Sequence, residues 1–97
     1  MAELDRLPAE DRLQEGLRDL AARRTTVSAL WLAMAEPRLR AAGVEMPETD
    51  GLPEEREIAF YELLEGCEDP YYRYNSLRAE LESLLSALEA RKSRLRA

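Results

Sequence analysis

Leucines and one tyrosine recur at alternating three- and four-residue steps through the last third of the chain. This spacing places them on one side of an α-helix, as in the buried seam of packed helices. Asp69 and Pro70 precede the series and supply a capping side chain and a suitable first helical residue. The pattern therefore predicts a long amphipathic helix over residues 70–94. Its apolar stripe consists of Tyr74, Leu77, Leu81, Leu84, Leu88 and Leu95, interrupted by Arg91.

A similar stripe runs through the first third of the chain and predicts a second long helix over residues 8–36. Pro8 suits its first position, and Pro37 is expected to kink or end it, because proline lacks an N–H and clashes with the preceding turn. Arg24 interrupts this stripe. We expect Arg24 and Arg91 to extend their charges to solvent at the edge of each seam, or to pair with an acid across an interface. The stripe consists of Leu13, Leu17, Leu20, Val27, Trp31 and Met34.

A short helix is expected between the two long ones. Glycines, prolines and an aspartate between Gly43 and Leu52 are typical of a turn. Pro53 is followed by two glutamates, which is a helix start, and Gly66 is suited to end the helix. These signals predict a helix over residues 53–65. No segment alternates apolar and polar residues with β-branched side chains, so no sheet is expected.

Together these elements predict one all-α domain over residues 1–97. The two long helices should form an antiparallel hairpin with coiled-coil-like packing, and the short helix should intervene between them. The first and the short helix are apolar on more than one face, which a lone hairpin cannot cover. We therefore expect the hairpin to complete a helical bundle by oligomerisation, or to bind a larger protein. The predicted interface consists of Trp31, Leu32, Ile58, Tyr61, Tyr71 and Tyr72.

Charge is unevenly distributed along this acidic chain, whose net charge is −6. Residues 43–70 contain ten acidic residues and one basic residue, Arg56, whereas residues 71–97 contain six basic and three acidic residues. An acidic centre repels phosphate, which argues against nucleic-acid binding. A basic or apolar protein partner suits this surface better. The basic end has a simpler explanation, because positive side chains stabilise the carboxyl end of a helix.

Several residues and motifs that are common in catalytic sites are absent from the sequence. It contains no histidine and one cysteine, Cys67, and no glycine-rich phosphate loop. Serines without a histidine lack the base that activates them, and zinc sites of the histidine and cysteine type are excluded. We therefore expect a protein that is not an enzyme and has no cofactor. A single cysteine and the lack of an apolar run of about 20 residues favour a cytoplasmic protein outside the membrane.

The sequence favours a protein–protein interaction module, such as an adaptor, an assembly factor or a small structural subunit. One alternative is a ferritin-like metal-binding protein that assembles a carboxylate site at a dimer interface from Glu36, Glu62 and Glu65. Dinuclear iron sites in helical bundles normally also contain a Glu-x-x-His pair, which is missing here. A third hypothesis is a regulator that inserts the acidic tip between Glu45 and Glu55 into a basic channel of a large enzyme.

Overall fold

The computed structural model describes residues 7–96, and every regular element in this range is an α-helix. The predicted all-α class is therefore confirmed. The described chain measures 43 × 29 × 20 Å along its principal axes. None of its helices combines the length and apolar composition that a membrane span requires. The helices are α1 (Glu10–Ala21), α2 (Val27–Ala33), α3 (Glu36–Ala41), α4 (Arg56–Leu64) and α5 (Pro70–Arg96).

The predicted continuous helix over residues 8–36 is wrong, because the chain breaks between α1 and α2. Arg23 has a left-handed backbone conformation with φ of 59°. Thr26 is extended, and its hydroxyl accepts a hydrogen bond from the Ala29 amide at 3.1 Å. A threonine in this role satisfies a free N–H at a helix start, so it begins a new helix. Arg24 therefore lies in the connection and pairs with Asp19 at 3.2 Å, not at the edge of a seam.

The break allows α1 to fold back against α2, and Gly16 makes their contact close. A Cβ atom at Gly16 would lie 2.6 Å from Leu32 Cδ1 and 2.7 Å from the Ser28 carbonyl oxygen. This packing covers Leu32 completely. The expectation that Leu32 would project from a second, uncovered face of a long helix is therefore wrong, because α1 occupies that face.

Pro37 lies in the first turn of α3, after the chain has turned at Met34 and Ala35. The predicted interruption near Pro37 is thus confirmed, and α3 is a separate short helix. It ends before Gly43, whose φ of 94° is accessible to glycine at little cost. The connection after Gly43 contains no helix until Arg56, so α4 starts three residues later than the predicted residue 53.

The leucine stripe of α5 forms one wall of the core, as predicted. Leu77 and Leu84 are fully buried, Leu81 and Leu88 are nearly so, and Tyr74 is half-buried. The side chain of the last member of the stripe, at position 95, lies outside those that the structure describes. Arg91 is half-buried on the same helix.

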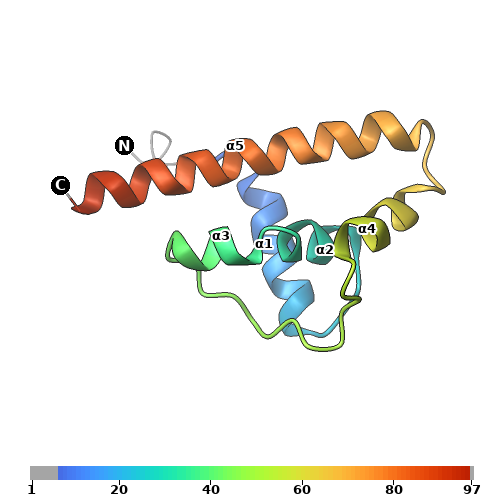
Figure 1. The fold of residues 1–97 in the computed structure, drawn as a ribbon, viewed down its shortest axis with the longest axis horizontal. Helices are drawn as coiled ribbons and strands as arrows, with labels where there is room; N and C mark the ends of the chain where they lie inside the picture. Colours follow the sequence, from blue (N-terminus) through green and yellow to red (C-terminus); the bar gives the residue numbers. More distant parts are fainter. Residues whose placement is uncertain (1–6, 97) are drawn as a thin grey trace.

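The centre of the molecule is α2, which is covered by α1, α4 and α5. Its Trp31 side chain is fully buried, and the indole N–H donates to the Leu77 carbonyl of α5 at 2.8 Å. Figure 1 shows α5 running along the whole molecule, with α1 crossing it and α2, α3 and α4 on the same side. This arrangement takes the place of the expected hairpin of two long helices, because α5 is the one long helix among residues 7–96.

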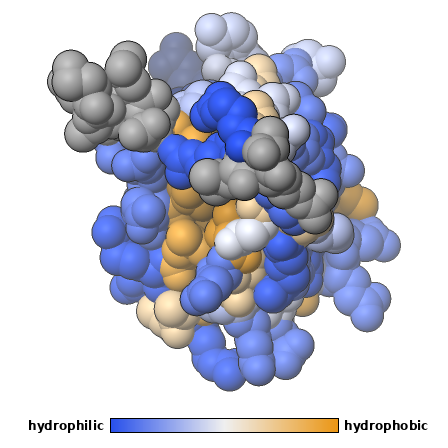
Figure 2. All heavy atoms as spheres, turned by 90° about the vertical axis from the view of Figure 1, so that its left-hand side faces the viewer, coloured by the Kyte–Doolittle hydropathy of each residue, from blue (hydrophilic) through white to orange (hydrophobic). Residues whose placement is uncertain are grey.

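The surface is mixed in character. Figure 2, viewed from the end where α3 and the last turns of α5 lie, shows a strip of hydrophobic residues between strongly hydrophilic surfaces. Large apolar side chains are also exposed on the other part of the molecule, on α4 and in the first turn of α5. They are Ile58, Leu63, Tyr71 and Tyr72.

Candidate functional site

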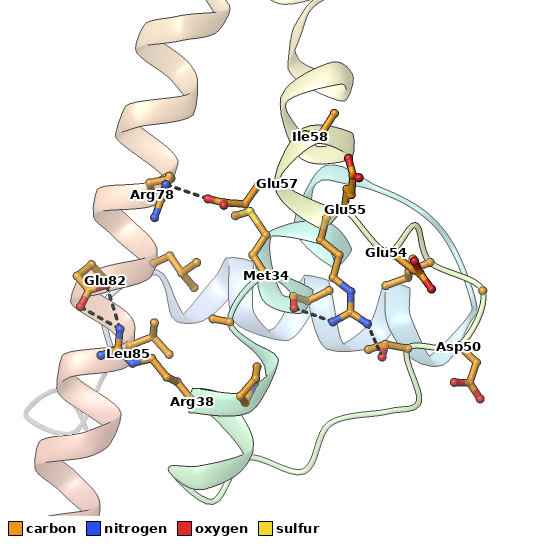
Figure 3. A pocket seen from close by; sticks show the side chains of 18 residues that line it. Met34, Arg38, Asp50, Glu54, Glu55, Glu57, Ile58, Arg78, Glu82 and Leu85 are labelled. Carbon is orange, nitrogen blue, oxygen red and sulfur yellow. Dashed lines mark hydrogen bonds and ion pairs between the residues drawn. The ribbon is translucent and has the colours of Figure 1, made fainter.

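An open groove of about 950 Å³ lies between α5 on one side and α4 with its preceding loop on the other (Figure 3). We call it the α4–α5 groove. Its lining residues come from the turn between α2 and α3 and the start of α3, the loop over residues 49–55, the first turn of α4, and one face of α5 between residues 78 and 85. The site depends on the interruption of the predicted helix over residues 8–36, because the separate helices α2 and α3 that result supply its floor.

The floor of the groove is apolar and its rims are charged. Ala33 lines it from the end of α2, Met34 and Ala35 line it from the turn before α3, and Leu81 and Leu85 line it from α5. Met34 is half-buried, whereas both leucines are nearly covered by the core. A methionine at this place can adapt to different apolar side chains because it is unbranched and flexible.

Arg38 closes one end of the groove by joining α3 to α5. Its Nη1 lies 3.1 Å from both carboxylate oxygens of Glu82. Its Nε and Nη2 donate to the two oxygens of Glu89 at 3.1 and 2.9 Å. These charge-assisted hydrogen bonds lower the pKa of Glu89 and raise the pKa of Arg38. Arg38 is therefore engaged by two acids of the same chain, whose combined negative charge exceeds its own.

Arg56, at the start of α4, joins the loop and α4 to the end of α2 and the start of α3. Its Nη1 donates to Glu36 Oε1 at 2.7 Å and to the Ala33 carbonyl at 2.9 Å, and its Nη2 donates to Thr49 Oγ1 at 3.0 Å. Thr49 in turn donates to Glu36 at 3.0 Å, and Arg40 binds the other carboxylate oxygen at 2.9 Å. The hydrogen bond from Arg56 lowers the pKa of Glu36, followed by smaller contributions from Arg40 and Thr49, against an opposing effect of burial.

At the other end of the groove, Arg78 of α5 faces Glu57 of α4 at 2.9 Å, as Figure 3 shows. Arg78 also donates to the Tyr74 hydroxyl at 3.3 Å, and this contact and the Glu57 charge raise its pKa. Beyond this ion pair lies a smaller apolar hollow of about 270 Å³, lined by Glu57, Ile58, Tyr61, Glu62 and Tyr74. The two hollows share Glu57 and Ile58. Because the ion pair is more than half exposed, it is a weak barrier between them.

Three acids on the loop side of the groove differ from Glu36, Glu57 and Glu82 in that no arginine of the described residues pairs with them. Asp50, Glu54 and Glu55 line the groove and are exposed. Within the described part of the chain, their carboxylates make no ion pair or hydrogen bond, whereas all three arginines of the lining are engaged by acids. The unneutralised charge of the groove is therefore negative.

The predicted interface residues fall into two groups. Trp31 and Leu32 are fully buried inside this chain, so neither contributes to an accessible surface. Ile58 is 56% exposed and lines the groove, and Tyr61 is half-buried with its ring centroid 5.4 Å from that of Tyr74. Two further tyrosines, at positions 71 and 72, are exposed in the first turn of α5 but do not line the groove. Of the predicted interface residues, the groove therefore retains Ile58, and Tyr61 lines the smaller hollow beside it.

The three glutamates of the hypothetical metal site do not lie together within this chain. Glu36 is held by Arg56 and Arg40 between α3 and α4, whereas Glu62 and Glu65 are exposed on and just after α4. Among residues 7–96 no three histidine, cysteine, aspartate or glutamate side chains are close enough together to hold a metal ion. The acidic tip of the third hypothesis is partly held against the body, since Met46 is buried and Arg40 donates to the Met46 and Pro47 carbonyls.

Sequence reasoning missed most of the groove lining. Met34 was expected in a helical stripe, and nothing indicated that Arg38 and Arg78 would face acids across it. One signal was present: Arg56 is the single basic residue in the acidic segment 43–70. A lone arginine among acids is suited to hold that segment against the rest of the fold.

The groove lining consists of apolar side chains, acids, arginines, a glycine and one residue with a hydroxyl group. Its hydroxyl group, that of Thr49, is already hydrogen-bonded to Glu36 and Arg56. Comparison of the chain with protein-family models, curated proteins and solved structures found no match. The α4–α5 groove is therefore the feature from which a function is inferred.

Proposed function

We propose that the protein is a non-enzymatic interaction module that receives an apolar segment of a partner protein in the α4–α5 groove. The main observation in support is the exposure of Ile58. This large apolar side chain is 56% exposed at the wall of an open groove with an apolar floor. Full burial of such a side chain contributes about 1.5–3 kcal/mol. A few contacts of this kind along the groove are enough to offset an association cost of several kcal/mol.

The ion pairs around the groove support this proposal. Arg38 fixes α3 to α5, and Arg56 fixes the loop and α4 to α3. A groove that is formed before the partner arrives loses less conformational entropy on binding. An adaptor, an assembly factor or a small structural subunit would each use such a surface.

The proposal is tested by photochemical cross-linking from single positions in the intact protein. A benzophenone side chain replaces Ile58 or Glu55 in the groove, and Ser83 on the exposed face of α5 serves as the control position. We expect the two groove positions to label one common protein that the control position does not label. Equal labelling from all three positions, or none from the groove, would contradict the proposal.

Binding of the labelled protein, once purified, is then measured by calorimetry. Ile58→Asp should weaken it at least tenfold, whereas Leu63→Asp should change it less than twofold, because Leu63 is 43% exposed on α4 but does not line the groove. Circular dichroism checks that both variants keep their helical content. A larger effect of Leu63→Asp than of Ile58→Asp would place the interface elsewhere.

A second candidate is self-association, in which a second copy covers Ile58 and completes a helical bundle. The same exposed side chain favours it. A cross-link between two copies of the chain from position 58 would distinguish this outcome from binding of a different protein.

A further inference from the structure

We propose that the occupant of the α4–α5 groove is a cationic amphipathic helix of a partner protein. Its apolar side chains lie over Met34 on the floor, and its basic side chains face Asp50, Glu54 and Glu55 on the loop side. This inference rests on the proposed function, and it adds the conformation, the charge and the orientation of the partner.

A helical occupant follows from the elements that border the groove. Residues 7–96 contain no strand, so there is no sheet edge to which an extended peptide could add. The groove is bordered on one side by α5 and on the other by the loop over residues 49–55 and the first turn of α4, and an amphipathic helix can place one apolar face between these two walls. A volume of about 950 Å³ corresponds to roughly two turns of a helix with a diameter near 10 Å.

The positive charge of the occupant follows from which groups in the groove are already paired. The lining contains three arginines, and each is bound to a glutamate of the same chain at 3.1 Å or less. Asp50, Glu54 and Glu55 have no such partner within the described residues. An anionic or neutral segment would leave these acids near a surface of lower dielectric without compensation, whereas lysine or arginine side chains would pair with them.

The orientation of the occupant follows from the position of these acids. Figure 3 shows Asp50 and Glu54 on the side of the loop, across the groove from Glu82 and Leu85 on α5. On the α5 side, Glu82 is ion-paired with Arg38, which it shares with Glu89. The acids that have no ion pair among the described residues therefore line one rim only, and Met34 lies on the floor between the two rims. A helix with adjacent apolar and basic faces can contact the apolar floor with one face and pair with the acids of this rim with the other.

The test uses three designed peptides of equal length and the intact protein. The first carries leucines at helical spacing i, i+3, i+4 and i+7 with lysines on the adjacent face, the second replaces the lysines by glutamates, and the third replaces the leucines by alanines. Binding is measured by calorimetry at 150 mM salt, where exposed charges are largely screened beyond about 8 Å. We expect binding of the first peptide, and binding at least tenfold weaker for the other two.

Two doubly substituted proteins locate the binding site. Glu54→Lys with Glu55→Lys should weaken binding of the lysine peptide at least tenfold. Glu65→Lys with Glu68→Lys changes the net charge equally, at exposed acids outside the groove, and should weaken binding less than twofold. If the lysines at the start of α4 disturb folding, Glu54→Gln with Glu55→Gln should still show a smaller loss in the same direction.

Equal weakening by the two doubly substituted proteins would reveal general attraction to an acidic protein and overturn the proposal. If the glutamate peptide binds as well as the lysine peptide, the proposed charge of the partner is wrong. If the alanine peptide binds equally well, the proposed apolar contact is wrong. Absence of binding of the lysine peptide up to 1 mM would contradict both. If these peptides fail while position 58 still cross-links a partner, this inference is wrong and the interaction module stands. If neither experiment detects an occupant, both are wrong.

Discussion

At the scale of single residues, Gly16 decides how closely α1 approaches α2. Its missing side chain leaves room for Leu32 and for the Ser28 carbonyl, both of which would lie within 3 Å of a Cβ atom. Glycine is a poor helix former, costing about 1 kcal/mol relative to alanine in a helix interior. The close contact between two helices is the physical reason for its presence in α1.

Replacing Gly16 by alanine should therefore destabilise the protein, although alanine favours a helix. We expect a loss of about 1–3 kcal/mol in the free energy of unfolding, because overpacking forces the two helices apart. Urea unfolding followed by Trp31 fluorescence measures it. Gly66→Ala is the matched control, since nothing lies within 4 Å of its Cβ position, and its effect should stay within about 0.5 kcal/mol. A more stable Gly16→Ala protein would contradict the observed packing.

Glu36 is the second residue with a large structural role, because it joins α3, the loop and α4 through Arg56, Arg40 and Thr49. Its pKa in the folded protein is lowered from the ordinary value of 4.5, chiefly by the Arg56 hydrogen bond. A lowered pKa means that the ionised form stabilises the folded state. This contribution is complete above the ordinary pKa and is lost as the pH falls through the lower, folded-state value.

The difference in unfolding free energy between the wild-type protein and Glu36→Gln should therefore be largest at neutral pH. It should shrink as the pH is lowered from about 5 to 3, because the wild-type carboxylate becomes protonated. Urea unfolding at a series of pH values measures it. Glu68 is exposed and has no ion pair with any residue that the structure describes, so Glu68→Gln should differ little from the wild type at any pH. A Glu36→Gln difference that is independent of pH would contradict the described network.

At the scale of elements, α5 provides the long wall against which the shorter helices pack. Its buried leucines contact the core from one side, and the Leu77 carbonyl accepts the Trp31 indole hydrogen bond from α2. Isolated helices are marginal in water, so α5 owes most of its stability to this apolar face.

Truncation of the stripe should be costly. Leu84→Ala should lower the free energy of unfolding by about 2–5 kcal/mol, since the side chain is fully buried, and Leu81→Ala should act in the same direction. Ser86→Ala, an exposed position on the same helix, serves as the control in urea unfolding. Losses below about 0.5 kcal/mol at both leucines would mean that the stripe does not pack as described.

At the scale of the whole molecule, segments from four parts of the chain meet around the α4–α5 groove. Ile58 remains exposed there, and the two tyrosines at positions 71 and 72 are 68% and 69% exposed nearby in the sequence. Of these three side chains, Ile58 alone lines the groove, and it is the one that the proposed partner would cover.

If a second copy covers this surface, the protein should associate at micromolar concentration, as sedimentation velocity would show. Ile58→Asp should then yield a folded monomer, because Ile58 is exposed. Leu32→Asp should instead unfold the chain, since Leu32 is fully buried beneath α1. A wild-type protein that remains monomeric at high concentration would exclude self-association and leave a different protein as the occupant.

The amino-acid sequence by itself determined the helical class, the extent of α5, the short helix before it and the connection after Gly43. These features depend on local signals: the spacing of the leucines, Asp69 with Pro70, and glycines at helix ends. The break between α1 and α2 was also encoded locally, by Thr26 as a helix cap, but the regular apolar spacing across it concealed the signal.

Only the tertiary structure decided which apolar side chains remain exposed and where the groove lies. Leu32 and Ile58 have the same character in the sequence, yet α1 buries the first and no element covers the second. The pairing of Arg38 with Glu82 and Glu89 joins residues more than 40 positions apart, which no local pattern specifies. Burial and long-range ion pairing depend on how helices are placed relative to one another, and that placement follows from packing the whole chain around α2.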